Sequence, residues 1–409
     1  MSFANPTRMG VIACPGGESF ANEVIPILRN LYRRNYERKA NDLAKVHNLS
    51  KEEVKWRMSL TSDLISNRPD LNSSPQNYEP PKIKIPVEFT KFANGEFKST
   101  ILSSVRDFDL FIFQDVENHY PYKFQNSGET SVLSVNDHLM CLFVTIDAAI
   151  QSNVRSVTLV LPAYPYARQH KRKGREALTA PWFGWMCENM GVRRIITLDI
   201  HSKEIVNCFR KTNLENLHAS YQILKKLTDI INIKDEELVV VSPDTGAIDR
   251  NKFYAENLQS PLAMIYKERD YSKVSKNAAD TNIKSARLLG DVNGKVAFMT
   301  DDMLGTGGTL IKAMRMLKEA GAKKIVCAIS LPLFSGSAIE AFDAAYKEGL
   351  FDAIIGTNAV YHDQTLTGKS WYVQADVSSL FAHFMMRLHH GRSTSPLLDN
   401  HKIIQKLLS

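Results

Sequence analysis

The sequence predicts an α/β protein made of two domains with mainly parallel sheets. Three observations lead to this prediction: the length of the chain, short apolar runs that alternate with amphipathic helical patterns, and polar side chains at the ends of several runs. The chain has 409 residues, of which 44% are hydrophobic. Because domains usually hold roughly one to two hundred residues, two domains are expected, each with its own core.

Six short apolar runs have the character of buried parallel strands. They are rich in β-branched residues, bounded by polar residues, and too short for helices. The runs are VTLVLPAY (157–164), IITLDI (195–200), LVVVSPD (238–244), VAFMTDD (296–302), IVCAISLP (325–332) and FDAIIGTN (351–358). Between two of them, TLIKAMRMLKEAG (309–321) predicts an amphipathic helix with Gly321 as its C-cap. Such alternation is typical of parallel α/β proteins, whose active sites lie at the carboxyl ends of the strands.

Two segments interrupt this alternation, and we expect both to be insertions onto the compact core. The first segment, residues 31–85, opens within the basic helical stretch RNLYRRNYERKANDLAKVHNLSKEEVKWRM (29–58) and continues as a loop-like segment. Residues 117–133 are polar and rich in turn-forming residues. A basic stripe could contact nucleic acid, but interspersed Glu and Lys are more typical of a solvated helix face. We therefore expect no nucleic-acid partner.

The composition favours small anionic ligands and an intracellular setting. The chain has 51 Lys and Arg against 44 Asp and Glu, a mild positive excess that suits nucleotides and sugar phosphates. Its five scattered cysteines form no CxxC pair and are expected to be reduced core residues. The first residues lack the basic start and apolar run of a signal peptide, and no apolar stretch is long enough to span a membrane. We expect a cytoplasmic protein with no membrane partner.

The segment VAFMTDDMLGTGGTLIKAM (296–314) carries the clearest chemical pattern. A buried strand ends in Asp301 and Asp302, and a glycine-threonine loop (306–309) and a helix follow. Glycines let successive backbone N–H groups converge, while the helix N-terminus and the threonine hydroxyls add further attraction for an anion. The two carboxylates can hold vicinal hydroxyls of a sugar whose phosphate lies in the loop. An acidic strand end followed by an ordinary helix cap is the purely structural alternative.

This segment resembles the binding motif for 5-phosphoribosyl 1-diphosphate (PRPP) shared by ribose-phosphate pyrophosphokinases and type I phosphoribosyltransferases. The resemblance implies that Asp301 and Asp302 bind the ribose. It also implies that the 5-phosphate is bound by Thr306, Gly307, Gly308 and Thr309. One position departs from the family pattern, because Gly305 stands where the family usually carries an acidic residue. The motif alone does not discriminate between the two groups of enzymes.

Five further segments resemble the pyrophosphokinases and stand in that family's order. They are KFANGEF (91–97), PAYPYARQHKRKGREALTA (162–180), ITLDIHSKEIVNCF (196–209), VVSPDTGAIDR (240–250) and MIYKERDYSKV (264–274). The ATP contacts that the resemblance implies are Phe92, Asn94, Glu96, Arg168, Gln169 and His201. Arginine suits such a site because its guanidinium stacks on flat rings and forks onto phosphate oxygens. Taken singly, each segment could be a turn or a solvated charge cluster; their order favours the pyrophosphokinases.

The same resemblance implies a magnesium ion and two catalytic cations. Mg²⁺ would lie near His201 and Asp244, where one carboxylate and the ATP phosphates suffice, because magnesium prefers oxygen ligands and keeps much of its water. The implied catalytic residues are Lys267 and Arg269. They are two positions apart, so in an extended strand both lie on one face and can reach one phosphate group.

The resemblance covers residues 9–398 and implies two phosphoribosyltransferase-like domains. Residues 1–210 would form the ATP side and residues 211–375 the ribose 5-phosphate side, with residues 376–409 returning as a C-terminal helix to the first domain. The implied reaction transfers diphosphate from ATP to ribose 5-phosphate, giving AMP and PRPP, in a homo-oligomer whose subunits share ATP sites. Two alternatives stay open: a phosphoribosyltransferase, and a regulatory subunit with weak catalysis, which Gly305 favours.

Overall fold

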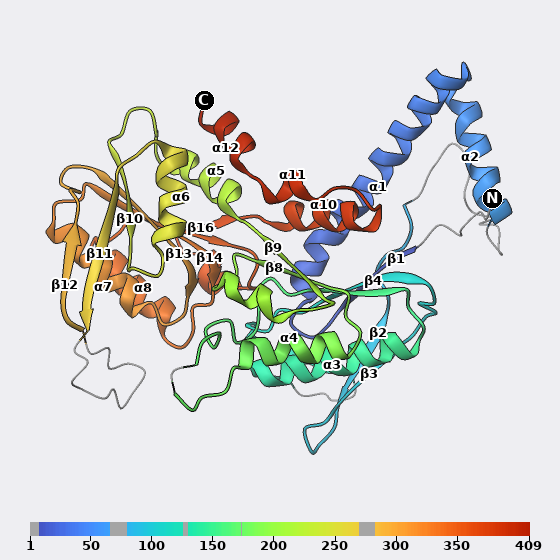
Figure 1. Ribbon diagram of the computed structural model, residues 1–409, viewed down its shortest axis with the longest axis horizontal. Coiled ribbons are helices and arrows are strands. Elements are labelled where there is room, and N and C mark those ends of the chain that lie inside the picture. The colour runs from blue at the N-terminus through green and yellow to red at the C-terminus, as the bar shows by residue number, and fades with distance from the viewer. Residues whose placement is uncertain (1–7, 66–79, 126–129, 173, 270–282) are drawn as a thin grey trace.

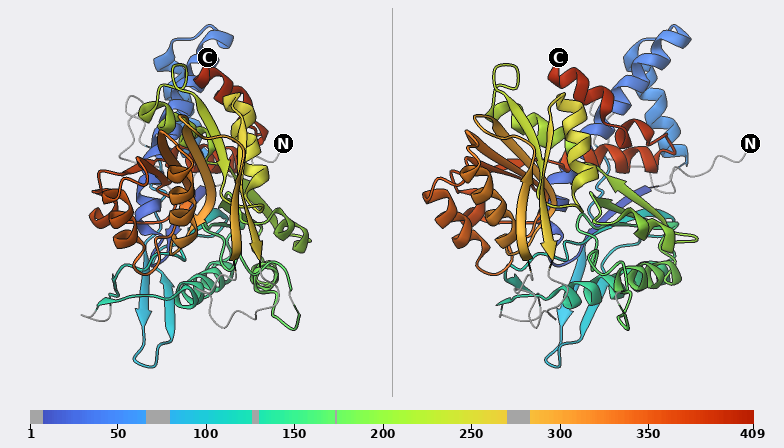
Figure 2. Two further views of the ribbon diagram at one scale, coloured as in Figure 1. Left: turned by 90° about the vertical axis from the view of Figure 1, so that its left-hand side faces the viewer. Right: turned by 60° about the vertical axis from the view of Figure 1, so that its left-hand side comes forward.

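Two α/β units make up the chain, each built on a mainly parallel sheet (Figures 1 and 2). A computed structural model describes residues 8–65, 80–125, 130–172, 174–269 and 283–409. In spatial order the first sheet contains β1 (Arg8–Ala13), β4 (Phe108–Phe113), β7 (Ser156–Val160), β8 (Arg194–Leu198) and β9 (Asn213–Leu217). The second contains β12 (Ile283–Leu289), β11 (Leu262–Arg269), β10 (Leu238–Ser242), β13 (Val296–Leu304), β14 (Lys324–Pro332), β15 (Ala353–Thr357) and β16 (Tyr372–Ala375). Within these two sheets only β12 pairs antiparallel, so the predicted fold class is confirmed.

Helices cover these sheets, and two small antiparallel hairpins stand apart from them. The first unit contains α1 (Glu18–His47), α2 (Lys51–Ile65), α3 (Val135–Gln151), α4 (Thr179–Asn189) and the 3-10 helix η1 (Lys203–Cys208). Next come α5 (Ser220–Ile230), α6 (Ile248–Leu258), α7 (Gly308–Glu319), α8 (Ala338–Lys347), α9 (Gln364–Thr367), α10 (Ser378–His389), α11 (Ser395–Leu398) and α12 (His401–Leu408). The hairpins are β2 (Val87–Lys91) with β3 (Phe97–Ile101), and β5 (Tyr122–Lys123) with β6 (Thr130–Ser131).

All six predicted strands are confirmed as β7, β8, β10, β13, β14 and β15. The first run extends beyond the strand, because β7 ends at Val160, two residues before Pro162, which has no N–H to donate to a ladder. The predicted helix is α7, and Gly321 follows its end with a φ of 84°. A Cβ at this glycine would come within 2.2 Å of Asn293 Oδ1, so both the backbone and the space require glycine here.

The basic stretch after residue 31 is helical, and it forms a hairpin that projects from the molecule. Helix α1 starts in the core of the first unit, where Phe20 and Leu28 are buried, and its second half extends outward with α2 against it (Figure 1). The Glu37 carboxylate on α1 forms ion pairs at 2.7 Å with Lys51 and Lys55 of α2, and these contacts join the two helices. Within the described residues, no helix combines the length and apolarity needed to cross a membrane.

The last helices of the chain lie against both units. Helix α12 contacts α5 and α6, whereas α10 lies along α1 (Figure 1). The rings of Phe20 and Phe381 meet edge to face at 5.0 Å between centroids. His389 Nδ1 lies 2.9 Å from the carboxylate of Asp109 on β4. Strand β9, which begins after the expected domain boundary at residue 210, belongs to the first sheet. The chain therefore passes from the first unit to the second just after Leu217.

We predict that Phe381→Ala destabilises the protein because it removes a fully buried ring at the contact between α10 and α1. Such a truncation typically costs about 3–5 kcal/mol in unfolding free energy. Chemical denaturation measures the change. Ser379→Ala, at an exposed position of the same helix, is the control and should change the unfolding free energy by less than about 0.5 kcal/mol. Equal midpoints for the two variants would contradict the prediction.

Candidate active site

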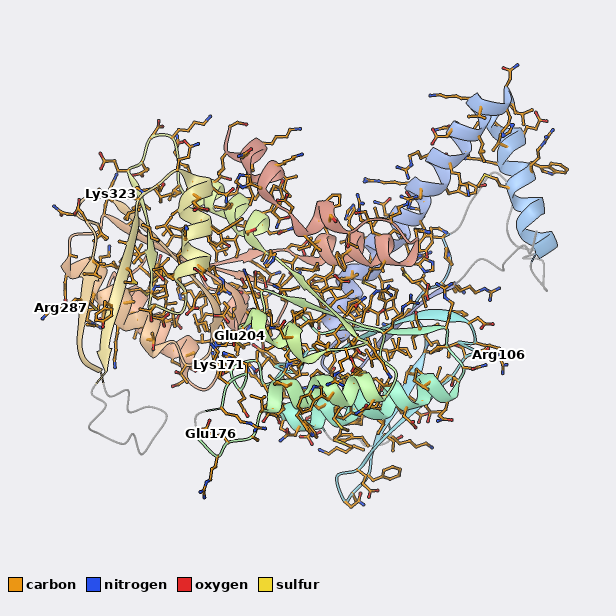
Figure 3. The ribbon with its side chains drawn as sticks, in the orientation of Figure 1. Arg106, Lys171, Glu176, Glu204, Arg287 and Lys323 are labelled. Carbon is orange, nitrogen blue, oxygen red and sulfur yellow. The ribbon has the colours of Figure 1, made fainter. Side chains whose placement is uncertain are left out.

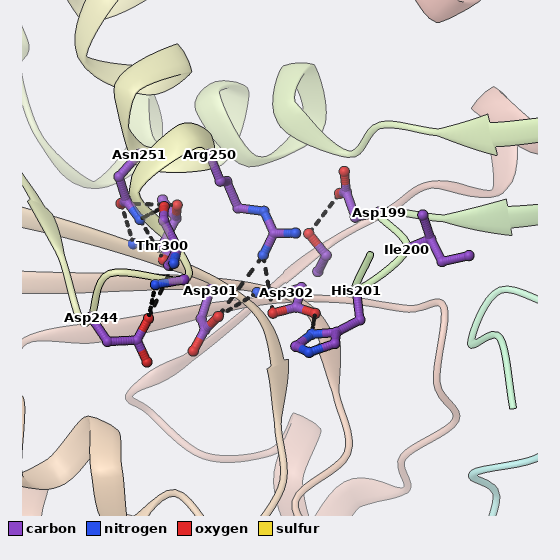
Figure 4. A network of polar contacts seen from close by, with 12 residues as sticks. Asp199, Ile200, His201, Asp244, Arg250, Asn251, Thr300, Asp301 and Asp302 are labelled. Atoms are coloured by element: carbon purple, nitrogen blue, oxygen red, sulfur yellow. Dashed lines mark hydrogen bonds and ion pairs between the residues drawn. The ribbon is translucent and has the colours of Figure 1, made fainter. Parts of the chain in front are cut away.

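The paired carboxylates lie near the end of β13, at the carboxyl edge of the second sheet. The Asp301 side chain accepts a hydrogen bond from the Asp302 N–H at 2.9 Å. Asp302 is largely buried and is held from two sides (Figure 4). Arg250 Nη1 lies 3.3 Å from its Oδ1, and His201 donates from Nδ1 to its Oδ2 at 2.6 Å. Because His201 follows β8 of the first sheet, this carboxylate joins the two units at the site.

Helix α6 supplies the arginine and is fixed to β13 by its next residue, Asn251. The fully buried Asn251 side chain donates to the Thr300 carbonyl at 2.9 Å and accepts from the Thr300 N–H at 3.0 Å. The position just before the acidic pair is therefore set by α6. Sequence reasoning missed both Arg250 and Asn251. The sequence contained one signal for Arg250. An arginine in the first turn of a helix is unfavourable beside the positive end of the helix dipole, so its presence indicates a nearby carboxylate that compensates it.

The two neighbouring carboxyl groups have opposite pKa shifts. Burial raises the pKa of Asp301 well above its usual range, and the charge of Asp302 raises it further. Burial also acts to raise the pKa of Asp302, but the hydrogen bond from His201 and the charge of Arg250 outweigh it and hold that pKa low. Asp302 is therefore the ionised member of the pair. Asp301 can carry a proton near neutral pH and can both donate and accept hydrogen bonds.

The glycine-threonine loop after β13 is tight on one side and open on the other. Gly307 has a φ of 74°, and a Cβ there would meet the Phe342 ring at 2.2 Å. At Gly308 a Cβ would have no atom within 4 Å, so this side of the loop is open space. Helix α7 begins at Gly308, and the N-cap residue Gly307 makes no side-chain capping hydrogen bond. The first N–H groups of α7 can therefore meet an anion.

The segment after β7 lies against the His201 segment and the end of β13. Arg168 and Gln169 are both exposed on it, and the His170 ring lies 5.4 Å from the His201 ring. Lys171 forms an ion pair at 3.3 Å with Glu204 of η1 (Figure 3). The structure therefore brings two of the three predicted ATP segments, those of Arg168 and His201, to the acidic pair.

The third predicted ATP segment, which carries Phe92, lies elsewhere. Phe92, Asn94 and Glu96 occupy the turn between β2 and β3, at the tip of a hairpin that projects from the first unit (Figures 1 and 2). Asn94 Oδ1 accepts from the Glu96 N–H at 3.2 Å, which shapes the turn. The Phe92 side chain is 46% exposed. In this chain the three residues do not meet the acidic pair.

Asp244 caps the loop before α6, where its Oδ1 accepts from the N–H groups of Gly246 at 2.9 Å and Ala247 at 3.1 Å. Figure 4 shows Asp244 in the same close-up as Asp301 and Asp302. Among the residues described by the structure, no three His, Cys, Asp or Glu side chains are grouped to hold a metal ion. Lys267 and Arg269 lie on β11, but their side chains are outside the described part of the structure.

A second buried carboxylate, Asp199, also joins the two units. It follows β8 with a φ of 41° and accepts from Ser330 Oγ on β14 at 2.6 Å and from His218 Nδ1 at 2.8 Å. Burial opposes its ionisation, yet the contact with His218 and the charge of Arg250 lower its pKa. The positive charge of Arg250 therefore favours the ionised form of both Asp199 and Asp302.

Two parallel α/β units, with an acidic pair and an anion-binding loop at a sheet edge, define a transferase of the phosphoribosyl class. Residues 82–191 match the N-terminal domain of ribose phosphate pyrophosphokinase, and residues 211–365 match the phosphoribosyl transferase domain. The chain belongs to the ribose-phosphate pyrophosphokinase family, as the following relatives show.

Curated relatives match most of the chain. Ribose-phosphate pyrophosphokinase 2 of Schizosaccharomyces pombe is 33% identical over 314 residues, which cover 76% of this chain and 89% of the relative. Ribose-phosphate pyrophosphokinase A of Dictyostelium discoideum is 33% identical, with 76% and 89% covered. The crystal structure of phosphoribosylpyrophosphate synthetase from Mycobacterium smegmatis has the same fold, with a TM-score of 0.67 at 24% identity. The alignment covers 94% of this chain and 100% of that one.

We predict that Asp301→Asn stabilises the protein at neutral pH, by about 1–2 kcal/mol. The raised pKa means that folded Asp301 binds a proton that the unfolded chain has already lost above about pH 4. Stability then falls as the pH rises from about 4 towards the folded pKa. The asparagine removes this loss, so the stability difference between the variant and the wild type should shrink on acidification. Chemical denaturation of both proteins at pH 5 and pH 7.5 measures this difference in unfolding free energy. If the variant were less stable than the wild type at pH 7.5, Asp301 would be ionised in the folded protein without loss of stability, and the prediction would be wrong.

Proposed function

We propose that the chain transfers the terminal diphosphate of ATP to ribose 5-phosphate, releasing AMP and forming PRPP. One observation carries the proposal: the acidic pair, with the open phosphate loop after it, meets His201 of the ATP segment from the other unit at 2.6 Å. The two substrates can thus be held at adjoining edges of two sheets. Holding both reactants in line is most of the catalysis that such a transfer needs.

On the ribose side, Asp301 and Asp302 hold the sugar hydroxyls, and the loop from Thr306 to Thr309 holds the 5-phosphate. Asp301 can donate or accept a hydrogen bond because of its raised pKa. Arg250 keeps Asp302 ionised and fixed in place. The oxygen of the ribose 1-hydroxyl then forms a bond to the β-phosphorus of ATP and its proton passes to solvent, while the bond from that phosphorus to the α-phosphate oxygen breaks and AMP leaves.

On the ATP side, Arg168, Gln169 and His201 contact the nucleotide, while Lys267 and Arg269 neutralise charge on the transferred group. Magnesium suits this edge of the sheet, because Asp244 carries carboxylate oxygens and the metal needs few protein ligands when phosphates complete its shell. When bound, it neutralises phosphate charge. His201 Nδ1 is engaged by Asp302, so only Nε2 faces other groups.

An assay of AMP release from ATP and Mg²⁺ tests the proposal. AMP that appears only when ribose 5-phosphate is added supports it. Diphosphate release from PRPP with a nucleobase, without AMP release in the first assay, would instead indicate a phosphoribosyltransferase. Binding of both substrates without turnover would indicate the regulatory subunit.

We also propose that ATP sites are shared between copies of the chain. Phe92 is exposed at the tip of a projecting hairpin and does not meet the acidic pair of its own chain, so a neighbouring copy would have to present it. A complete ATP site then requires assembly, and the specific activity should fall on dilution. A species that light scattering identifies as a monomer and that keeps full specific activity would overturn this proposal.

Gly308→Val should abolish ribose 5-phosphate binding and leave ATP binding largely intact. A Cβ at Gly308 meets no protein atom, so the added side chain occupies only the space where the phosphate would lie. Calorimetry with each ligand measures both effects. Gly307→Val is the contrasting variant. The positive φ of Gly307 and the nearby Phe342 ring leave no room for a side chain, so this variant should unfold at a lower temperature and bind both ligands more weakly. Equal loss of both ligands in Gly308→Val would mean that the loop is not the phosphate site.

Lys267→Ala and Arg269→Ala should each lower kcat by about a hundred- to a thousandfold and change substrate affinity far less. Their contacts would strengthen as charge develops on the transferring phosphorus. Steady-state kinetics separates kcat from KM. Lys252→Ala on α6 is the control, because that side chain is 65% exposed and its ion pair with Glu256 is long, at 3.8 Å. Wild-type turnover in both catalytic variants would place the chemistry elsewhere.

A further inference from the structure

A polar pocket outside the active site lies where the two units meet. Its volume is about 180 Å³. Its walls come from three segments: the start of α1 with Glu18 and Ser19, residues 118–122 of the second predicted insertion, and Tyr361, which follows β15 of the second sheet. The Asp115 carboxylate accepts a hydrogen bond from the Tyr361 N–H at 2.9 Å and joins the units beside the pocket. A ligand in this pocket would therefore contact both units.

The pocket has the same position on the first sheet as the active site has on the second. Gly16 follows β1 and Asn118 follows β4, and these two strands are parallel neighbours. In the second sheet Asp244 and the acidic pair follow β10 and β13, which are also parallel neighbours. The carboxyl ends of parallel strands are where ligands bind in such sheets. Since the proposed reaction uses none of the residues that line this pocket, its ligand is distinct from the two substrates.

Glu18 brings a carboxylate to this pocket without a cationic partner. Within the described ranges it forms no ion pair and accepts one long hydrogen bond, from the Tyr122 hydroxyl at 3.3 Å. Lys84 lies in the same region, but its ammonium group donates to Asn22 Oδ1 at 3.0 Å. Burial raises the pKa of Glu18, and the hydrogen bond from Tyr122 and the charge of Lys84 offset this only in part. A cation beside Glu18 would supply the compensation that this partly buried group lacks.

Three tyrosines line the pocket together with this carboxylate: Tyr120, Tyr122 and Tyr361. The rings of Tyr120 and Tyr361 lie 5.1 Å apart between centroids at an angle of 76°, and the His119 ring stacks on Tyr120. These contacts hold the rings in place before a ligand arrives. Aromatic rings attract organic cations through their quadrupole, and clusters of such rings recognise ammonium groups. The Tyr361 hydroxyl forms no hydrogen bond within the described part of the chain and is available to a polar group of the ligand.

We propose that this pocket binds a small organic ammonium ion, with its charge beside Glu18 and its carbon atoms against the tyrosine rings. Phosphate-bearing ligands do not suit it, because Glu18 repels them. Hard inorganic cations take several oxygen ligands at once, whereas Glu18 is the only carboxylate among the described residues that line the pocket. Because Tyr361 belongs to the second unit, the bound ion stabilises the contact between the units. The proposal does not depend on the proposed reaction.

Choline and the neutral alcohol in which carbon replaces its nitrogen test the proposal, because they share a shape and differ in charge. Ligand-observed NMR titration of the full chain gives the Kd of each. We expect choline to bind about tenfold more tightly than the alcohol, and Glu18→Gln to abolish this preference. Tyr361→Ala should weaken choline binding about fivefold and Tyr361→Phe less than about twofold, since phenylalanine keeps the ring. Glu52→Gln, at an exposed position in the first turn of α2, is the control and should keep the wild-type Kd.

Other outcomes would overturn the proposal. Equal affinity of the wild type for choline and the alcohol, or no binding of choline, removes the role of charge, and this comparison needs no variant. Displacement of choline by an equal concentration of potassium chloride would indicate a site for an inorganic cation. The same loss of choline binding in Glu52→Gln as in Glu18→Gln would indicate a general effect of net charge. Thermal unfolding of each variant checks that it is folded.

Discussion

The buried carboxylate of Asp302 is the constraint around which the site is organised. A charge in this position is tolerated only because Arg250 and His201 hold it from two sides. Losing one partner of such a group typically costs about 3–5 kcal/mol, since an uncompensated buried charge remains. The two partners come from different units, so the requirement to satisfy one carboxylate also fixes how α6, β13 and the end of β8 meet. The distance between the two substrate sides follows from that arrangement.

The local parts of the fold and site could be read from the sequence. A run such as VAFMTDD indicates a strand because its apolar and β-branched residues must be buried, and this depends on neighbours in the chain alone. The phosphate loop was found for the same reason: the φ of 74° at Gly307 is a backbone requirement of its own segment. The left-handed φ of Gly321 is another requirement of this local kind.

The remaining features depend on residues far apart in the sequence. Arg250 and Asn251 matter because α6 brings them to Thr300 and Asp302, about 50 positions later, and no local pattern encodes that approach. The same holds for Asp199 and Ser330, which are 131 positions apart. The direction in which the β2–β3 hairpin points is set by packing of the first unit, so the segment with Phe92 could be recognised without being placed.

The contact of α10 with α1 has a consequence for how the protein is made. Phe20 on α1 is synthesised 361 residues before Phe381, whose ring covers it. Domains generally fold as they emerge from the ribosome, N-terminal part first. The first unit therefore waits, with part of its core uncovered, until the whole second unit has been translated. Newly made chains pass through a stage in which this uncovered face is available to chaperones, and a chain released early keeps it.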